Sequence, residues 1–352
     1  WDGFYFANRK NLFYMEDAEG IPGNNVTGLR SKYIVEDRRN DISQFQLNTR
    51  ASWDLNERLN VTGGILADIF RGHNFNTVKD LLGGEFWLDI DKFAESDQPA
   101  NRDALQNDLE NPDNLAVEGD IIGNNYYVFQ RGGTLWGTGR YSHNRYSVYL
   151  SGNVRYTSMW REGLMRKGLF PDNSLGKSEV LDYMTWGVKA GGDYRITGRH
   201  LITLNTLIAT NPPLFRNSFL SPRTRNTATP NLQEETIISA DASYVLRAPW
   251  ITGRITGYYT KFMKQTEVTT FYHDDLMTLV NYAMTNIDKE NYGLEIGAEV
   301  TLTTGLTLNT AAALGQYLWV NNPNITITQD NNNEVLRRSE EHTSELQSPN
   351  TI

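Results

Sequence analysis

The sequence predicts an all-β fold, an antiparallel transmembrane β-barrel with short periplasmic turns and long extracellular loops. Several segments alternate strictly between apolar and polar residues, which places a strand between two different environments. These segments run to roughly 12–15 residues, against about 5–6 for strands of globular sheets, and about 9–11 residues cross a bilayer at a tilt. The segments also form pairs, and the short turns all fall at the same end of the strands.

The clearest pair covers residues 291–320. Its first strand directs Glu295 and Glu299 to one side and an apolar series to the other: Tyr292, Leu294, Ile296, Ala298, Val300 and Leu302. Residues 303–305 form the turn. The returning strand continues the pattern to Tyr317 and Trp319, where aromatic side chains suit a membrane–water interface.

Composition limits the alternatives. The chain has 352 residues, no cysteine and a net charge of −9, which argues against nucleic acid as a partner. Mean hydropathy is −0.52, and no run approaches the roughly 18 apolar residues of a transmembrane helix. The 11% of aromatic residues suits interfacial girdles, although a secreted glycan-binding β protein would also be rich in Tyr, Trp and Asn.

Four further hairpins precede the hairpin at 291–320, with turns at residues 54–58, 142–144, 197–199 and 247–250. In the second, Val148, Leu150 and Val154 alternate with polar residues. We therefore expect about ten strands in five hairpins.

Long polar segments separate the hairpins at 71–125, about 159–183, 211–235 and 263–289. Short helices are expected at 80–84 and 86–90, and an incomplete strand end with a loop around 21–25 is expected within residues 1–42. Loops of this size are uncommon in compact soluble domains but expected on the extracellular side of outer-membrane barrels.

Both ends of the chain are expected to be incomplete. Residues 1–10 contain neither a Met nor a basic and apolar signal sequence. Residues 338–348 read RSEEHTSELQS, which is identical to a translated frame of a common sequencing adapter. We therefore expect a barrel over 1–337 and an adapter-derived tail over 338–352, with a polar disordered tail as the alternative.

Several motifs resemble those of TonB-dependent outer-membrane receptors. They are residues 231–235 followed by Ser239, Asp241, Tyr244 and the 247–259 hairpin, and residues 282–299 with their Gly293-Leu294-Glu295 core. Residues 80–91, 160–178 and 271–282 are similar to the extended loops of the large receptors of gut-type Gram-negative bacteria. The resemblance covers 1–337 in layout.

The resemblance implies about ten to twelve strands of a 22-stranded barrel in the cell outer membrane of a Gram-negative bacterium. The TonB–ExbB–ExbD complex would drive uptake of a siderophore, cobalamin or a glycan. A surface lipoprotein and outer-membrane lipid are further expected partners. The plug, the TonB box and an aromatic-terminated last strand are not found, so coupling residues of the family have no positions here.

No catalytic residue, metal site or cofactor is predicted. The five histidines lack the i,i+4 spacing of metal pairs, and Asp89, Asp91 and Glu95 lack the order of an EF-hand. We read that acidic segment as a solvated loop. The glycines between 132 and 139 do not precede a helix, so they are not a phosphate loop.

Aromatic and Arg side chains in the loops are the candidates for substrate contact, because aromatics stack on rings and Arg pairs with anions. They are Trp87, Trp160, Arg161, Phe215, Arg216, Tyr272 and Trp319. The alternative is that they pack the loops or form the girdle. A second set is expected to face the lumen, where it forms networks or contacts a plug: Arg155, Asp241, Arg254, Glu295 and Glu299.

The leading hypothesis is therefore an active transporter, not an enzyme. A passive porin-like channel is the first alternative. A secreted glycan-binding β protein is the second, and it would be soluble without detergent. A barrel hydrolase would need an outward Ser–His pair, and the only near candidate, Ser142-His143, consists of neighbours in a turn.

Overall fold

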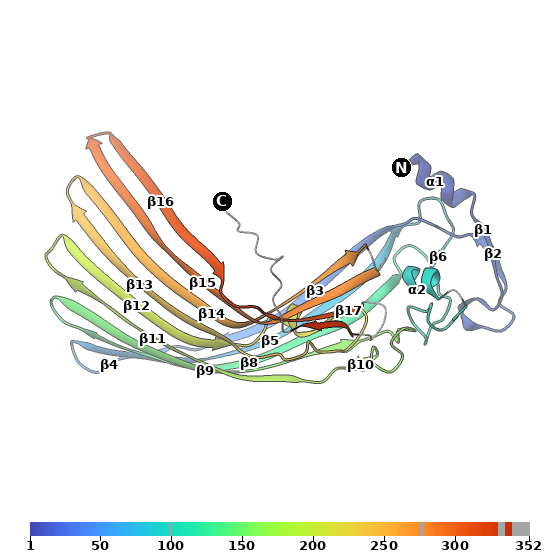
Figure 1. The fold of residues 1–352 in the computed structure, drawn as a ribbon, viewed down its shortest axis with the longest axis horizontal. Helices are drawn as coiled ribbons and strands as arrows, with labels where there is room; N and C mark the ends of the chain where they lie inside the picture. Colours follow the sequence, from blue (N-terminus) through green and yellow to red (C-terminus); the bar gives the residue numbers. More distant parts are fainter. Residues whose placement is uncertain (99, 275–277, 330–334, 340–352) are drawn as a thin grey trace.

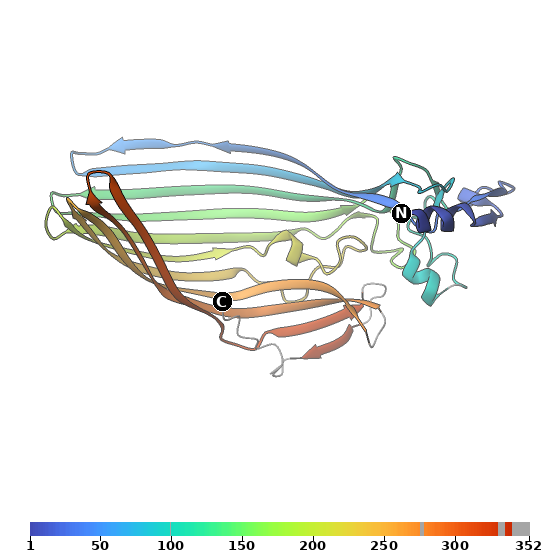
Figure 2. The ribbon, with the colours of Figure 1, turned by 90° about the horizontal axis from the view of Figure 1, so that it is seen from above.

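One continuous curved sheet dominates the computed structural model, which describes residues 1–98, 100–274, 278–329 and 335–339. Within those residues the sheet has 14 antiparallel strands and is not closed (Figures 1 and 2). The strands are β3 (Val35–Asn48), β4 (Ala51–Asp54), β5 (Leu59–Asp80), β8 (Ile121–Ser142), β9 (Tyr146–Gly163), β10 (Gly176–Lys177), β11 (Leu181–Arg195), β12 (His200–Asn211), β13 (Glu235–Ala248), β14 (Ile251–His273), β15 (Thr278–Thr303), β16 (Leu306–Trp319), β17 (Asn324–Gln329) and β18 (Val335–Ser339). The expected all-β, partial-barrel fold is confirmed.

The strand register gives the sheet two chemically different faces. Residues directly opposite each other in antiparallel strands share a face, and Ile65, Leu135, Val154 and Trp186 stand opposite one another across β5, β8, β9 and β11. All four are about half exposed or more. We call this side the apolar face.

The other side, the polar face, carries the residues between them. Thr134, Arg155 and Thr185 form one of its rows across β8, β9 and β11. Asn205 and Asp241 belong to another, across β12 and β13. The alternation predicted from the sequence therefore holds in these rows from β5 to β13.

The tight turns gather at one end of the sheet, as predicted (Figure 1, left). They cover residues 55–58, 143–145, 196–199, 249–250 and 304–305. The connections 81–120, 164–180 and 212–234 lie at the opposite end, which we call the loop end. There β6 (Trp87–Leu88) pairs with β7 (Leu115–Ala116), and two short helices form, α2 (Lys92–Asp97) and α3 (Phe215–Ser218).

The prediction of a loop over residues 263–289 was wrong. β14 continues to His273 and β15 begins at Thr278, so both strands extend well beyond their neighbours. A register irregularity between Phe262 and Glu267, with Lys264 at φ 60°, breaks the strict alternation there. The interruption hid a strand whose β-branched residues resume after it.

Two helix predictions and the strand expected at the start also need correction. Residues 80–84 and 86–90 form the end of β5, a turn and β6; the helix begins later, where the Asp91 side chain accepts hydrogen bonds from the Phe93 and Ala94 amides. Residues 1–42 contain α1 (Asp2–Arg9), β1 (Leu12–Met15), a 3-10 turn over Ala18–Gly20 and β2 (Val26–Leu29) before β3 begins.

Arg338 and Ser339, the first residues of the expected tail, end β18. The rest of that tail, residues 340–352, lies outside the described residues. Within the described part of the chain, no helix is both long and apolar enough to cross a membrane.

Candidate functional site

Segments far apart in the sequence meet at the loop end around a buried pair of opposite charges. Asp89 follows β6, and Lys167 belongs to the connection between β9 and β11. Asp89 Oδ1 accepts hydrogen bonds from the Gly123 amide at 2.9 Å and from Asn107 Nδ2 at 2.8 Å. Lys167 Nζ donates to the carbonyl oxygen of the same Gly123 and, at 3.4 Å, to Asn107 Oδ1. Gly123 and Asn107 therefore bridge the two charges.

Burial sets the electrostatics of this pair. Asp89 is 4% exposed and Lys167 7%, so water screens neither charge well. Burial lowers the pKa of Lys167 to about 8, against the opposing effect of Asp89. Burial also raises the pKa of Asp89. The positive charge of Lys167 and the hydrogen bonds that Asp89 accepts from Gly123 and Asn107 act in the opposite direction. The reading of Asp89 as part of a solvated acidic loop was wrong.

A cavity of about 180 Å³ lies beside this pair. Its walls come from six separate segments and include Asp91, Phe93, Asn124, Lys167, Arg223 and Leu279. Amide, cationic and aromatic groups line it together, which is the mixture that small-molecule sites use to fix a polar ligand.

Arg161 ties the loops to the polar face. It is 1% exposed at the loop end of β9. Its guanidinium donates to the carbonyl oxygens of Pro222 at 2.6 Å and Ser174 at 2.8 Å, and to Asn226 Oδ1 at 2.5 Å. Arg225, in the same 212–234 connection, donates to the Gln329 carbonyl of β17 at 3.1 Å. This connection therefore crosses the polar face from β9 to β17.

Nearer the tight turns, the polar face carries charged side chains. Arg155 Nη2 pairs with Asp68 at 2.7 Å and also donates to Thr134 and Thr157. Asp241 accepts from Asn205 Nδ2 at 3.0 Å. The sequence predicted that Arg155 would form such a network, but its partner Asp68 was not anticipated.

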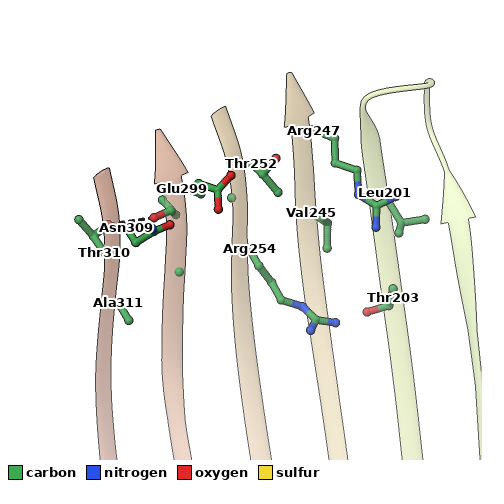
Figure 3. Close-up of a pocket in the computed structure, with 13 residues that line it drawn as sticks. Leu201, Thr203, Val245, Arg247, Thr252, Arg254, Glu299, Asn309, Thr310 and Ala311 are labelled. Carbon is green, nitrogen blue, oxygen red and sulfur yellow. Dashed lines mark hydrogen bonds between the residues drawn. The ribbon is translucent and has the colours of Figure 1, made fainter. Parts of the chain in front are cut away.

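Arg254 and Glu299 line a hollow of about 600 Å³ close to the turns, together with Thr203, Val245 and Thr252. Figure 3 shows the Arg254 side chain extending along the face toward the strand that carries Val245. Glu295 lies opposite Thr256 in the register, on the same face. The five residues expected at the lumen therefore share the polar face, and their role there stays a prediction.

The seven loop candidates do not form one site. Trp160 lies on the apolar face, stacked on Phe129 at 5.0 Å. Arg161 holds the loops together. Trp87, in β6, packs beneath the Lys92 ammonium group of α2. The others are spread over three places: Phe215 and Arg216 in α3, Tyr272 near the end of β14, and Trp319 at the end of β16 beneath Lys289. Substrate contact by these residues stays a prediction.

Sequence reasoning missed Lys167, Asn107 and Gly123. A signal was present, because Asp89 stands between Leu88 and Ile90, and Lys167 precedes Gly168, Leu169 and Phe170. Charges embedded in apolar runs indicate burial. Among the described residues, no group of three His, Asp or Glu side chains is arranged to hold a metal ion.

The chain matches no protein-family model and no curated protein sequence. Its fold is shared by solved structures. A copper transporter, OprC, is 11% identical with a TM-score of 0.54, over 82% of this chain and 42% of that one. The ferric-catecholate import receptor Fiu from E. coli K12 is 12% identical with a TM-score of 0.50, over 86% and 42%.

The FrpB iron transporter from Neisseria meningitidis is 11% identical with a TM-score of 0.50, over 80% of this chain and 36% of that one. These structures are TonB-dependent outer-membrane receptors, so the fold resemblance predicted from the sequence is confirmed. Their names describe transporters and receptors and not enzymes, in line with the expectation. The present chain spans about two fifths of their length.

Proposed function

We propose that this chain forms part of the wall and loops of an outer-membrane receptor that actively takes up a large or scarce nutrient. The apolar face carries the argument. Burying one large apolar side chain stabilises a protein by about 1.5–3 kcal/mol, and well over a dozen such side chains are exposed on the strands. Exposing that face to water would therefore cost tens of kcal/mol, a cost that is removed when the face contacts the hydrocarbon of a membrane. This opposes a secreted glycan-binding protein.

The height of the apolar face fits a membrane. On β8 it runs from Tyr141 near the turn to Arg131, a distance of ten residues along the strand. At about 3.3 Å per residue and a tilt of about 40°, this corresponds to about 25 Å, the height of the apolar band of outer-membrane barrels. Tyr141 and Tyr146 mark one boundary with ring centroids 6.1 Å apart, and Phe129 and Trp160 mark the other.

The arrangement of the loops supports a gated receptor over a passive porin. The 212–234 connection, held by Arg161 and Arg225, crosses the polar face instead of leaving it open. Energy from the TonB–ExbB–ExbD complex would then drive ligand release, with a surface lipoprotein as a further partner. A hydrolase is disfavoured because Ser142 and His143 lie at a tight turn, where the His143 ring packs on Tyr146.

The substrate classes are a siderophore, cobalamin or a glycan. Structures with this fold are named for copper, iron and ferric-catecholate transport, which makes metal chelates the first ligands to test. The cavity beside Lys167 is the proposed contact point at the loop end, because its polar lining can orient an incoming ligand.

Uptake of radiolabelled ferric chelates and cobalamin by cells producing the full-length protein tests this proposal. Uptake should require TonB, whereas a passive pore would continue without it. Asn124→Trp, which fills the cavity, should lower uptake about tenfold at an unchanged protein level. The matched control Asn144→Trp, in the exposed turn 143–145, should leave uptake unchanged. TonB-independent uptake, or equal effects of the two variants, would contradict the proposal.

A further inference from the structure

A strip of aromatic rings and cations crosses the apolar face at its loop-end boundary. Five rings follow one another across β5, β8 and β9: Phe75, His73, Tyr127, Phe129 and Trp160. Consecutive ring centroids are 4.2, 4.4, 5.8 and 5.0 Å apart. Four cations stand over these rings at 4.6–5.4 Å: Arg39, Arg71, Arg131 and Lys177.

The register places this strip on the membrane side of the sheet. Arg131 stands opposite Ile69 of the apolar face, and Leu135 follows on the same side of β8. Phe129 stands opposite both Arg71 and Trp160. The strip therefore begins where the apolar band ends, at the level of the lipid headgroups, and it cannot reach a ligand held over the polar face.

Three of the four cations have no ion pair within the part of the chain that the structure describes. Arg39 pairs with Asp41 at 2.6 Å. Within the described residues, no carboxylate lies within ion-pair distance of Arg71, Arg131 or Lys177, although Glu162 stands opposite Lys177 in the register. Elsewhere on the apolar face Lys261 is neutralised by Glu290 at 2.9 Å. Among the described residues of the apolar face, these unneutralised cations lie on β5, β8 and the β9–β10 edge.

We infer that Arg71, Arg131 and Lys177 form a binding site for the phosphate groups of lipid A, on the outside of the barrel. This inference rests on the proposed outer-membrane location, where lipopolysaccharide forms the outer leaflet. Its acyl chains would lie on the apolar face below, while its phosphates meet the guanidinium and ammonium groups. Stacking of Arg71 on Tyr127, and of Arg131 and Lys177 on Trp160, holds the cations at this level and limits their loss of side-chain entropy on binding.

The test is native mass spectrometry of the full-length protein in detergent, titrated with bis-phosphorylated lipid A. One cation near a charged lipid surface contributes about 1 kcal/mol, or about fivefold in affinity. Replacing all three cations by Gln should therefore weaken lipid A binding about hundredfold. The matched control Arg39→Gln should change it less than about twofold, because Asp41 already neutralises that cation.

Dephosphorylated lipid A should bind wild type and the triple variant equally weakly, and inorganic phosphate should not compete at millimolar concentration. Unchanged binding by the triple variant, or full competition by inorganic phosphate, would overturn the inference. Equal losses in the triple variant and Arg39→Gln would also overturn it. A protein that does not reach the outer membrane of its host would contradict the proposed function instead, and density-gradient fractionation distinguishes that outcome.

Discussion

The wall near the tight turns and the loop end are stabilised in different ways. In the wall, Asn153 and Val154 are both exposed and differ only in the face to which they point. At the loop end, Arg161 and Lys167 are buried and their polar atoms contact segments from distant parts of the chain. The effect of substituting a wall residue should therefore depend on which face of the sheet its side chain occupies. The effect of substituting a buried residue at the loop end should depend on the partners that its side chain loses.

Removing a loop anchor should give the largest effect. Arg161→Met leaves the Pro222 and Ser174 carbonyls and the Asn226 side chain without their donor. Each buried group left unpaired costs about 1–3 kcal/mol, so the free energy of unfolding should fall by about 3–5 kcal/mol. Urea unfolding in lipid vesicles measures it. Arg216→Met, at an exposed position in α3, should stay within about 0.5 kcal/mol, and equal losses would remove the contrast between buried and exposed loop cations.

Charge on the wall should matter on one face alone. Val154→Arg places a cation against lipid near the middle of the apolar band and should lower the free energy of unfolding by about 2–4 kcal/mol. Asn153→Arg, one residue away on the polar face, should change it by less than about 1 kcal/mol. The same unfolding assay compares them. If Asn153→Arg is the more damaging variant, the two faces have been assigned the wrong way round.

The buried lysine should make loop stability depend on pH. The pKa of Lys167 is about 8 in the folded chain, against an ordinary value of 10.5. Between these values the unfolded chain binds more protons, so this group's contribution to stability rises with pH and is lost as pH falls through 8. From pH 7.5 to 9.5 the gain is about 2 kcal/mol.

Unfolding measured at both pH values, for wild type and Lys167→Met, isolates this contribution. The variant should lack the rise of about 2 kcal/mol that wild type shows between pH 7.5 and 9.5. A rise of the same size in the variant would assign the pH dependence to other groups.

The smallest effect is expected for the ion pair on the polar face. Asp68→Asn removes the charge opposite Arg155, but the Arg155 side chain is partly exposed and retains Thr134 and Thr157. The loss should be about 1 kcal/mol. Asp193→Asn, on β11, changes a side chain that has no hydrogen bond or ion pair among the described residues and should change stability by less than about 0.5 kcal/mol. A loss above about 3 kcal/mol for Asp68→Asn would mean that this ion pair in the wall contributes as much to stability as Arg161 does at the loop end, against the prediction.

Much of the wall was predictable from the sequence because the face that a strand residue occupies follows from its position in the alternation. Alternation assigns Leu135 and Val154 to one face and Arg155 to the other without knowledge of any distant residue. Where the register slips, between Phe262 and Glu267, the same reasoning failed and mistook two long strands for a loop.

The loop end was not predictable in this way. Whether Arg161 contacts a ligand or a loop depends on the positions of Ser174, Pro222 and Asn226, which no local pattern encodes. Trp160 shows the same limitation, because its place in the sequence suggested a loop while the extension of β9 to Gly163 puts it on the apolar face. The cavity beside Lys167 is likewise formed by segments that are far apart in the sequence, so only the three-dimensional structure identifies it.

The most direct test of the account is the sidedness of single cysteines, which this cysteine-free chain makes possible. Asp172→Cys lies in the 164–180 connection and Glu57→Cys in the 55–58 turn, and both positions are exposed. In intact cells, a membrane-impermeant maleimide should label Asp172→Cys and should label Glu57→Cys only after the outer membrane is permeabilised. Labelling of Glu57→Cys alone, or equal labelling of both before permeabilisation, would contradict a membrane-spanning sheet with its loop end at the cell surface.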